Sequence, residues 1–466
     1  MSRFDAAKAK IRARAVPLIV ATALLMENLD SAVLSTSLPR IAEDLQTNPI
    51  HLKLALTSYL LAVAIFIPAS GWAADRFGTR RVFRWAIAIF ALGSIACGLS
   101  TSLLGLILSR VLQGLGGSMM VPVGRLIVLR ATPRAGMVAA LAWLTVPALI
   151  GPVLGPPLGG FITTYFQWRW IFWINVPIAV LGGALVTLYI PRMPGEAVRR
   201  LDVKGFLLIG PGLALLLTGL TLAGLDMAPA PVVAAMVLSG CVLTLAYLVH
   251  ALRVAAPLVD LRLMQVPTFR LSVQGGTLFR IGSGALLFLL PLMFQLGFGL
   301  TPFQSGMMTF ASGAGALLMK FMAQPLLRRF GFRRVLRLNA LLAALFIVMP
   351  AFFTPQTPYL LMVFVLFLGG LSRSLQFTSI NAVAYADISA ERLSSATSFN
   401  AALQQLTGSI GITVAAFGLQ AVQEWQGATL IDAATFPPVF VFVALLASAS
   451  SYWFHKLDAK AGAALV

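Results

Sequence analysis

Long apolar runs, each followed by a short charged turn, make up most of this sequence. Several runs reach the roughly 20 residues that a helix needs to cross a bilayer core about 30 Å thick. Of the 466 residues, 59% are hydrophobic and 11% are charged, which is too apolar for a soluble protein of this length. Because backbone polar groups inside lipid must be satisfied within their own segment, such runs form helices. The chain is predicted to be an all-α membrane protein.

Fourteen runs qualify as expected transmembrane spans. They cover residues 16–38, 52–73, 82–100, 103–127, 136–160, 169–190, 203–224, 230–249, 269–294, 302–323, 335–353, 358–382, 393–420 and 436–455.

The basic residues are concentrated in every second turn along the chain. When the first three residues of each span are counted with the turn before it, 26 of the 34 Lys and Arg lie in the N-terminus, the C-terminus and the turns after even-numbered spans, whereas 3 lie in the opposite turns and 5 deeper within spans. Positive charge is enriched on the cytoplasmic side of membrane proteins, so both termini are expected in the cytoplasm. The net charge of +19 therefore serves membrane topology, and we expect no nucleic-acid partner.

One charged turn occurs twice. The turn 71–81 (GWAADRFGTRR) resembles 324–334 (QPLLRRFGFRR), 253 positions later, with Arg328 in place of Asp75. A repeat of this kind is typical of duplicated transporters. If the duplication is real, spans 1 to 6 match spans 9 to 14, and spans 7 and 8 are inserted between them. The predicted architecture is two six-helix bundles plus two extra central spans.

The duplication also predicts the domain organisation. The expected parts are a cytoplasmic N-terminus (1–15), an N-terminal bundle (16–190), a linker with two spans (191–268), a C-terminal bundle (269–455) and a cytoplasmic tail (456–466).

Signatures of an enzyme or a metal site are absent from the sequence. It has no phosphate-binding loop and no paired histidine ligands, and its two cysteines, Cys97 and Cys241, lie inside apolar runs. We expect no catalytic activity, no cofactor and no metal.

Four motifs resemble those of the major facilitator superfamily, and within it the fourteen-span drug:proton antiporters of the EmrB/QacA type, most like the bacterial MdtD-like branch. They are the turn 71–81, LDSAVLSTSLP at 29–39, LSRVLQG at 108–114 and GPVLGPPLGG at 151–160. The resemblance implies a monomeric, proton-coupled antiporter of the bacterial inner membrane that exports small molecules, most simply in multidrug efflux.

Charged residues inside spans are costly, so the few present are candidates for the mechanism. Glu27 and Asp30 are three residues apart and share one helix face. At 1.5 Å per residue, Asp30 lies roughly 21 Å from the cytoplasmic start of its span and Arg110 roughly 10 Å below the outer end of its own, so their depths agree. We expect Asp30 to carry the coupled proton with Arg110 as its partner, or the two to form a static ion pair. Glu27 either shares the proton or contacts the substrate.

A second group of residues is expected to line the substrate cavity: Arg280, Arg373, Gln113, Gln376 and Gln404. The alternative for these residues is a structural bond between helices. Deep within the spans there are five basic residues and two acidic ones. That bias favours an anionic cargo, such as a small carboxylate or its metal chelate of the iron citrate type, as the alternative to a drug.

Two motifs are expected to control conformational gating. The first is the charged turn and the second is the glycine- and proline-rich run of span 5, where small residues permit close helix packing. Their residues are Gly71, Asp75, Arg76, Gly78, Arg80, Gly151, Pro152, Gly155, Pro156 and Gly159.

Overall fold

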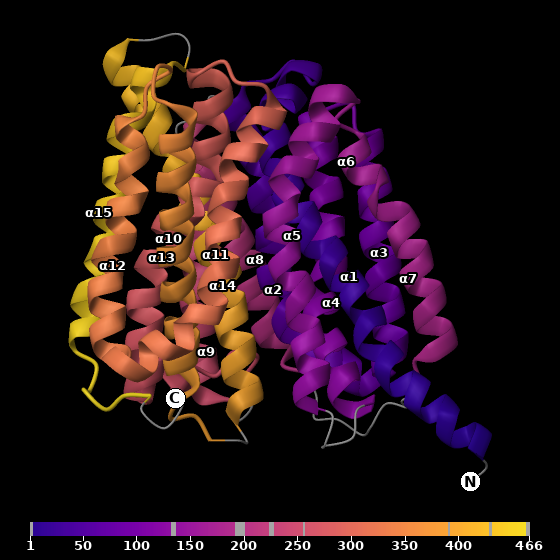
Figure 1. The fold of residues 1–466 in the computed structure, drawn as a ribbon. Helices are drawn as coiled ribbons and strands as arrows, with labels where there is room; N and C mark the ends of the chain where they lie inside the picture. The colour runs from indigo at the N-terminus through magenta and orange to yellow at the C-terminus, as the bar shows by residue number, and fades with distance from the viewer. Residues whose placement is uncertain are drawn as a thin grey trace.

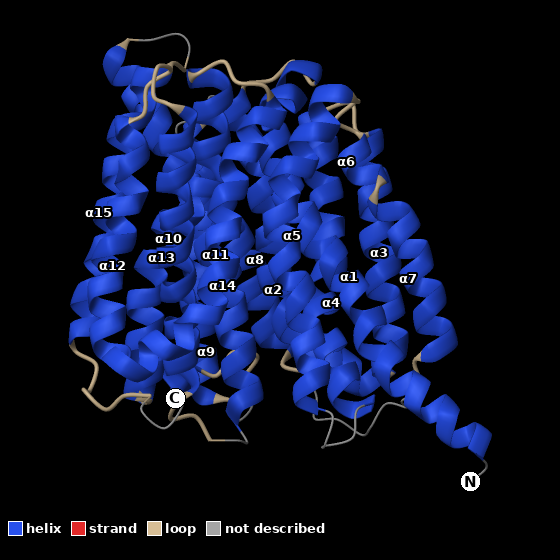
Figure 2. Ribbon diagram, viewed as in Figure 1, coloured by secondary structure: helices blue, strands red, loops and turns tan. Residues whose placement is uncertain are grey.

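The computed structural model describes the backbone of residues 3–131, 137–191, 201–222, 228–254, 257–389, 392–427 and 431–462. Within these ranges the regular elements are helices and no strand occurs, as the all-α prediction requires (Figure 2). Both ends of the chain lie at the same end of the helical bundle (Figure 1). We call this end the terminal face and the opposite end the distal face.

The long helices follow one another with short connections. Their bounds are α1 (Arg3–Asp44), α2 (Lys53–Phe77), α3 (Thr79–Leu99), α4 (Leu103–Ala131), α5 (Met137–Tyr165), α6 (Trp170–Trp173), α7 (Asn175–Tyr189), α8 (Val203–Leu222), α9 (Ala230–Arg253), α10 (Pro267–Leu292), α11 (Pro302–Phe330), α12 (Phe332–Val348), α13 (Tyr359–Tyr385), α14 (Leu393–Gln426) and α15 (Phe436–His455), with a short π-helix, η4 (Met293–Gly297), at the end of α10.

Within the described residues every expected span coincides with helix, although the sixth, 169–190, is broken at Ile174 into α6 and α7. In the described part of the chain, twelve helices are long and apolar enough to cross a membrane, with α6 and α7 counted together. The other two expected spans correspond to α5 and α11. The number of fourteen crossings stays a prediction.

The same packing pattern occurs in both halves of the molecule. The helix pairs α1 with α5, α2 with α4, α3 with α4, α1 with α7 and α3 with α7 pack together in the first half. In the second half the corresponding pairs are α10 with α14, α11 with α13, α12 with α13, α10 with α15 and α12 with α15. This equivalence is the one that the repeated turn predicts.

The repeated turn itself has the same backbone conformation in both copies. Gly78 joins α2 to α3 with φ 87° and ψ 132°, and Gly331 joins α11 to α12 with φ 72° and ψ 156°. Positive φ is unfavourable for any residue with a Cβ atom, so both copies require glycine here.

The two halves meet along two symmetry-related contacts, α5 with α11 and α2 with α14. The inserted pair, α8 and α9, lies beside the second of these contacts. Phe206 of α8 packs on Phe66 of α2 with ring centroids 5.6 Å apart, and the Thr221 hydroxyl lies 3.1 Å from that of Thr413 in α14. Of the inserted pair, α8 therefore contacts both halves.

Candidate functional site

Asp30 of α1 and Arg110 of α4 form an ion pair in the interior of the first half. The Arg110 Nη1 atom lies 2.5 Å from Asp30 Oδ2, and each side chain is 1% exposed. The helices α1 and α4 are in contact, which brings the two residues together. The pairing expected from their equal depths is therefore present.

A polar shell surrounds the carboxylate of Asp30. Gln113 Nε2 and Asn175 Nδ2 both donate hydrogen bonds to Asp30 Oδ1, at 2.8 and 2.7 Å. The same two amides also donate to the hydroxyl of Ser94, at 2.7 and 3.2 Å. Four helices, α1, α3, α4 and α7, thus contribute to one buried network.

Arg110 is itself fixed from three sides. Its Nη1 atom also donates to Gln113 Oε1 at 2.6 Å, and its Nε atom donates to the carbonyl oxygen of Ala55 at 3.2 Å. The guanidinium carbon lies 4.3 Å from the ring centroid of Tyr59, a cation–π contact. The planar, multiply donating guanidinium suits this site in a way that a lysine amine does not.

Sequence reasoning placed Gln113 in the substrate cavity and missed Asn175 and Ser94. In the structure Gln113 belongs to the Asp30 network, where its amide group contacts four different side chains, those of Asp30, Ser94, Cys97 and Arg110. Asn175 and Ser94 are uncharged residues within apolar runs. Their position relative to Asp30 depends on how α3 and α7 are rotated against α1, which a single sequence does not encode.

Glu27 lies one helical turn from Asp30 on α1. Its side chain is buried, and its Oε2 atom accepts no hydrogen bond from the described residues. A buried carboxylate without a donor is unfavourable as an anion, so Glu27 differs from Asp30 in chemistry as well as in position.

In the second half, Arg280 of α10 is buried among polar but uncharged groups. Its Nη2 atom donates to Oδ1 of Asn381 and of Asn400, both at 3.0 Å. Its Nε and Nη1 atoms have no hydrogen-bond acceptor, and no carboxylate pairs with it among the residues that the structure describes. Arg280 follows Glu27 by 253 positions and is therefore its counterpart in the repeat. Two of its nitrogen atoms are left without an acceptor among the described residues.

A cavity of about 300 Å³ lies between the halves, against Pro152 of α5 and Gly313 of α11. Two cations, Lys320 and Arg373, line it without an acidic residue in its lining. Lys320 donates a hydrogen bond to the hydroxyl of Thr378 at 2.9 Å, and Arg373 donates to the hydroxyl of Ser312.

The two other predicted cavity residues lie elsewhere. Gln376 accepts a hydrogen bond from Asn339 Nδ2 at 2.8 Å and donates to the carbonyl of Leu336 at 3.0 Å, so it joins α12 to α13. This is the structural role that the sequence left open. Gln404 is exposed on α14 and does not line the cavity of Lys320 and Arg373.

The charged turn at the terminal face links four helices, α2 to α4 and α3 to α7. Asp75 at the end of α2 pairs with Arg130 at the end of α4, with 2.7 Å between Oδ1 and Nη2. Arg80 at the start of α3 donates to the carbonyl of Thr187 in α7. Arg76 is exposed, and a methyl group on Gly71 would meet nothing within 4 Å. Of this motif, Asp75, Gly78 and Arg80 have specific structural contacts.

Three glycines of α5, Gly151, Gly155 and Gly159, pack against α1 in their own half. A Cβ atom on Gly151 would lie 2.6 Å from the Cβ atom of Asn28, and one on Gly155 would overlap Ala32. Gly159, one turn further, approaches α1 in the same way. Their spacing of four residues forms a small-residue stripe, which allows the two helices to touch.

The neighbouring face of α5 does contact the second half, at Pro156 and beyond. A Cβ atom on Gly306 of α11 would overlap the carbonyl oxygen of Pro156, and one on Gly160 would overlap that of Pro302. The backbones of α5 and α11 are therefore in direct contact toward the distal face.

We call this contact of α5 with α11, at Pro156, Gly160, Pro302 and Gly306, the distal seal. Two hydrogen bonds extend it. Phe303 N donates to Thr164 Oγ1 at 3.0 Å, and Gln295 Nε2, in η4, donates to the carbonyl of Thr36 in α1 at 2.9 Å. Both bonds connect one half to the other. The structure is thus closed between the halves at the distal face.

The arrangement and the sequence relatives agree on the family. The major facilitator superfamily model matches residues 20–254 and 273–460. The chain belongs to the major facilitator superfamily. This superfamily comprises transporters, so the chain is a membrane transporter for small molecules.

Two curated relatives show the same similarity. MdtD of Salmonella heidelberg (strain SL476) and MdtD of Salmonella typhimurium (strain LT2), which carry the provisional name of multidrug resistance proteins, are each 40% identical to the chain over 397 residues. The match covers 85% of this chain and 84% of each relative.

Solved structures share the fold. A D-xylose–proton symporter superimposes with a TM-score of 0.68 at 14% identity, covering 96% of this chain and 98% of the symporter. A POT family transporter in complex with 5-aminolevulinic acid gives 0.69 at 15% identity, covering 94% of both chains. At such identities the likeness concerns the fold alone.

Proposed function

We propose that this major facilitator protein is a proton-coupled antiporter that exports small molecules, with amphiphilic drug-like compounds as its cargo. The observation that carries the proposal is the buried pair of Asp30 and Arg110 within a network of four helices. An ionisable pair inside the membrane is costly to maintain and marks a proton path in many transporters. The name of the MdtD relatives supports the choice of cargo.

The proposal includes a topology. The chain crosses the bacterial inner membrane fourteen times as a monomer, and the terminal face lies in the cytoplasm. The six-helix bundles span 16–190 and 269–455, and 191–268 carries the extra pair. The excess of Lys and Arg in the turns of the terminal face supports this orientation.

Coupling follows from the electrostatics of the pair. Protonation of Asp30 removes the negative charge that compensates Arg110, and an uncompensated buried cation costs several kcal/mol. The cost is relieved when Arg110 turns to another acceptor or to water, which changes the contact between α1 and α4. Because α1 also packs along the glycine stripe of α5, that change reaches the distal seal. A proton thus biases which face of the transporter is open.

The charged turn supplies the second lock in this proposal. The bond between Asp75 and Arg130 holds the terminal ends of α2 and α4 together, and Arg80 joins α3 to α7. When the transporter switches from the distally closed state, these contacts are the ones that rearrange. Glu27 takes part in proton transfer or in substrate contact next to Asp30.

A second candidate cargo is a small anionic metabolite, such as a carboxylate or its metal chelate. The cavity lined by Lys320 and Arg373, and the free donors of Arg280, favour it. A carboxylate group would provide acceptors for the two Arg280 donors that have none among the described residues, and a negative charge for Lys320 and Arg373, whose cavity lining contains no acid.

Proton movement in everted membrane vesicles that contain the protein distinguishes the two candidates. We expect a lipophilic cation to collapse part of the imposed pH gradient, and citrate with or without iron to leave it unchanged. A response to citrate alone would identify the anionic cargo and would contradict multidrug export.

The matched variants for this assay are Asp30→Asn and Glu43→Gln. Both remove one carboxylate from α1, but Glu43 lies on the surface in an exposed pair with Arg40. The proposal predicts loss of the response in Asp30→Asn and a normal response in Glu43→Gln. Equal responses in the two variants would rule out Asp30 as the proton carrier.

A further inference from the structure

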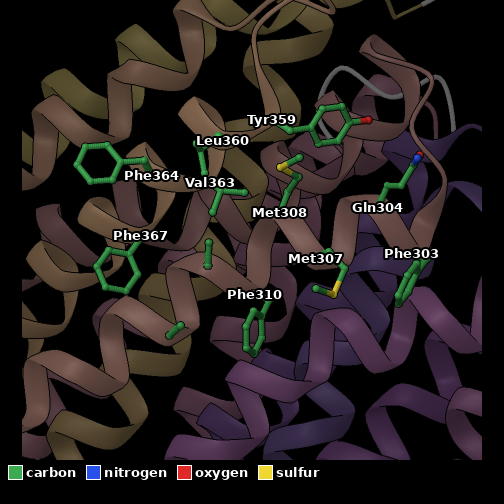
Figure 3. Close-up of a pocket in the computed structure, with 12 residues that line it drawn as sticks. Phe303, Gln304, Met307, Met308, Phe310, Tyr359, Leu360, Val363, Phe364 and Phe367 are labelled. Atoms are coloured by element: carbon green, nitrogen blue, oxygen red, sulfur yellow. The ribbon is translucent and has the colours of Figure 1, made fainter.

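An apolar groove lies between α11 and α13, next to the distal face. It has a volume of about 510 Å³ (Figure 3). One wall is the stripe of Phe303, Met307, Phe310 and Ala314 on α11, spaced so that all four lie on one side of the helix. The opposite wall comes from the first turns of α13.

The groove ends where α11 and α13 come into close contact. A Cβ atom on Gly315 would overlap the carbonyl of Phe367, and one on Gly370 would overlap that of Ser312, so α11 and α13 meet backbone to backbone there. On the distal side of this contact, larger side chains of both helices line the groove. Ala314 and Phe367 form the floor.

The groove is open to the outside of the bundle. Leu360 and Phe364 of α13 and Met307 of α11 are 80%, 56% and 45% exposed, although all three are apolar. On a chain that spans the membrane, a surface of this kind faces lipid. The polar side chains of the lining, Gln304 and Tyr359, lie near the distal ends of the two helices (Figure 3).

The length of the groove identifies its occupant. From Phe303 to Ala314 the α11 wall extends about 16 Å at 1.5 Å per residue. This is close to half of the roughly 30 Å hydrocarbon core, which is the depth of one leaflet. The apolar floor therefore lies near the bilayer midplane, and Tyr359 lies where interfacial aromatic residues meet the headgroups.

We propose that the groove between α11 and α13 binds one acyl chain of a phospholipid from the leaflet at the distal face. The chain enters beside Tyr359 and Gln304 and ends at Ala314. Phe303 separates the groove from the distal seal, because its ring also packs edge-on against Phe161 of α5, with centroids 6.2 Å apart. The bound acyl chain lines the lipid side of that seal.

Photo-crosslinking tests this proposal in the full-length protein, reconstituted into vesicles of phosphatidylethanolamine and phosphatidylglycerol. A trace of phosphatidylethanolamine carries a diazirine in the middle of one acyl chain, and peptide mass spectrometry locates the adducts. We expect adducts on Met307, Leu360 and Phe364 to exceed those on Leu341 and Leu345 of α12 several-fold, although all five side chains are exposed.

Filling the groove provides the control. Ala314→Leu raises the floor and Val363→Phe narrows the wall, and each should remove most of the groove adducts. Leu318→Phe adds similar bulk to exposed surface of α11 outside the groove and should leave them unchanged. Adducts spread in proportion to exposure, or insensitive to both filling variants, would reduce the groove to ordinary lipid-facing surface.

A lipophilic cation in excess distinguishes lipid from cargo. The proposal predicts that it leaves the adducts on Met307 and Leu360 unchanged, and displacement would instead make the groove a cargo site and overturn the assignment. Because crosslinking needs no transport, a failure here is separable from a failure of proton antiport.

Discussion

At the scale of single residues, the N-terminal half concentrates its polar chemistry at Asp30. Three donors on two other helices, Arg110, Gln113 and Asn175, converge on one carboxylate. The sequence predicted the pairing of Asp30 with Arg110, because a charge inside a span is energetically costly and needs an opposite charge at the same depth in the membrane. It could not predict Asn175, whose role depends on helix rotation. Nor did it predict that Lys53 would be buried at the start of α2.

Arg110→Lys tests whether the several hydrogen bonds of the guanidinium group stabilise the protein in addition to its positive charge. A lysine amine cannot reach Asp30, Gln113 and the carbonyl of Ala55 together, so we expect a loss of about 1–3 kcal/mol in the free energy of unfolding. Thermal unfolding in detergent measures it. Arg40→Lys, in an exposed pair, should change stability by less than about 1 kcal/mol. Equal effects in both variants would show that only charge counts at Arg110.

At the scale of elements, close helix approach decides which glycines matter. The sequence identified the run of α5 as a packing motif but not which partner each residue would take. Gly151, Gly155 and Gly159 contact α1, whereas Pro156 contacts Gly306 of α11. Gly306 was not predicted from the sequence, because it lies near the start of an expected span and outside the four motifs.

Gly306→Ala should weaken the distal seal, because its methyl group would overlap the carbonyl of Pro156. Such overpacking costs about 1–3 kcal/mol. We expect faster maleimide labelling of a cysteine introduced at Thr163, a buried residue near the distal end of α5. Gly71→Ala, which meets nothing within 4 Å, is the control and should leave labelling unchanged. Unchanged labelling in Gly306→Ala would contradict the seal.

The inserted pair has its own contact at the terminal face. Partial burial raises the pKa of the Asp202 carboxyl, but hydrogen bonds from His250, Gly205 and Leu258 together leave it below its ordinary value of 3.8. These bonds join the start of α8 to the end of α9 and to the segment before α10.

A depressed pKa means that Asp202 stabilises the fold above pH 3.8 and that the stabilisation is lost as the pH falls through the lowered pKa. We expect Asp202→Asn to lower the unfolding temperature at pH 7. The difference in unfolding temperature between the variant and the parent protein should shrink when the pH is lowered below 3.8. A difference that is the same at pH 7 and in acid would show that ionisation of Asp202 does not affect stability.

At the scale of the whole molecule, the duplication organises the fold. The repeat of one turn, 253 residues apart, predicted equivalent halves, and the paired helix contacts follow that equivalence. The halves differ in chemistry: the first holds the ion pair of Asp30 and Arg110, whereas Arg280 in the second has no carboxylate partner in the part of the chain that the structure describes. Hydrophobicity and charge alternation are enough to place helices, because both are local properties. The position of the distal seal arises from contacts between distant segments, so the sequence alone did not show it.

In the proposed mechanism, Asp30 exchanges a proton when cargo binds. Purified protein in weakly buffered detergent solution, with a pH indicator, measures it directly when a lipophilic cation is added. We predict proton release from the parent protein and from Glu43→Gln, and none from Asp30→Asn, with all three equally folded by circular dichroism. Undiminished release from folded Asp30→Asn would contradict the account.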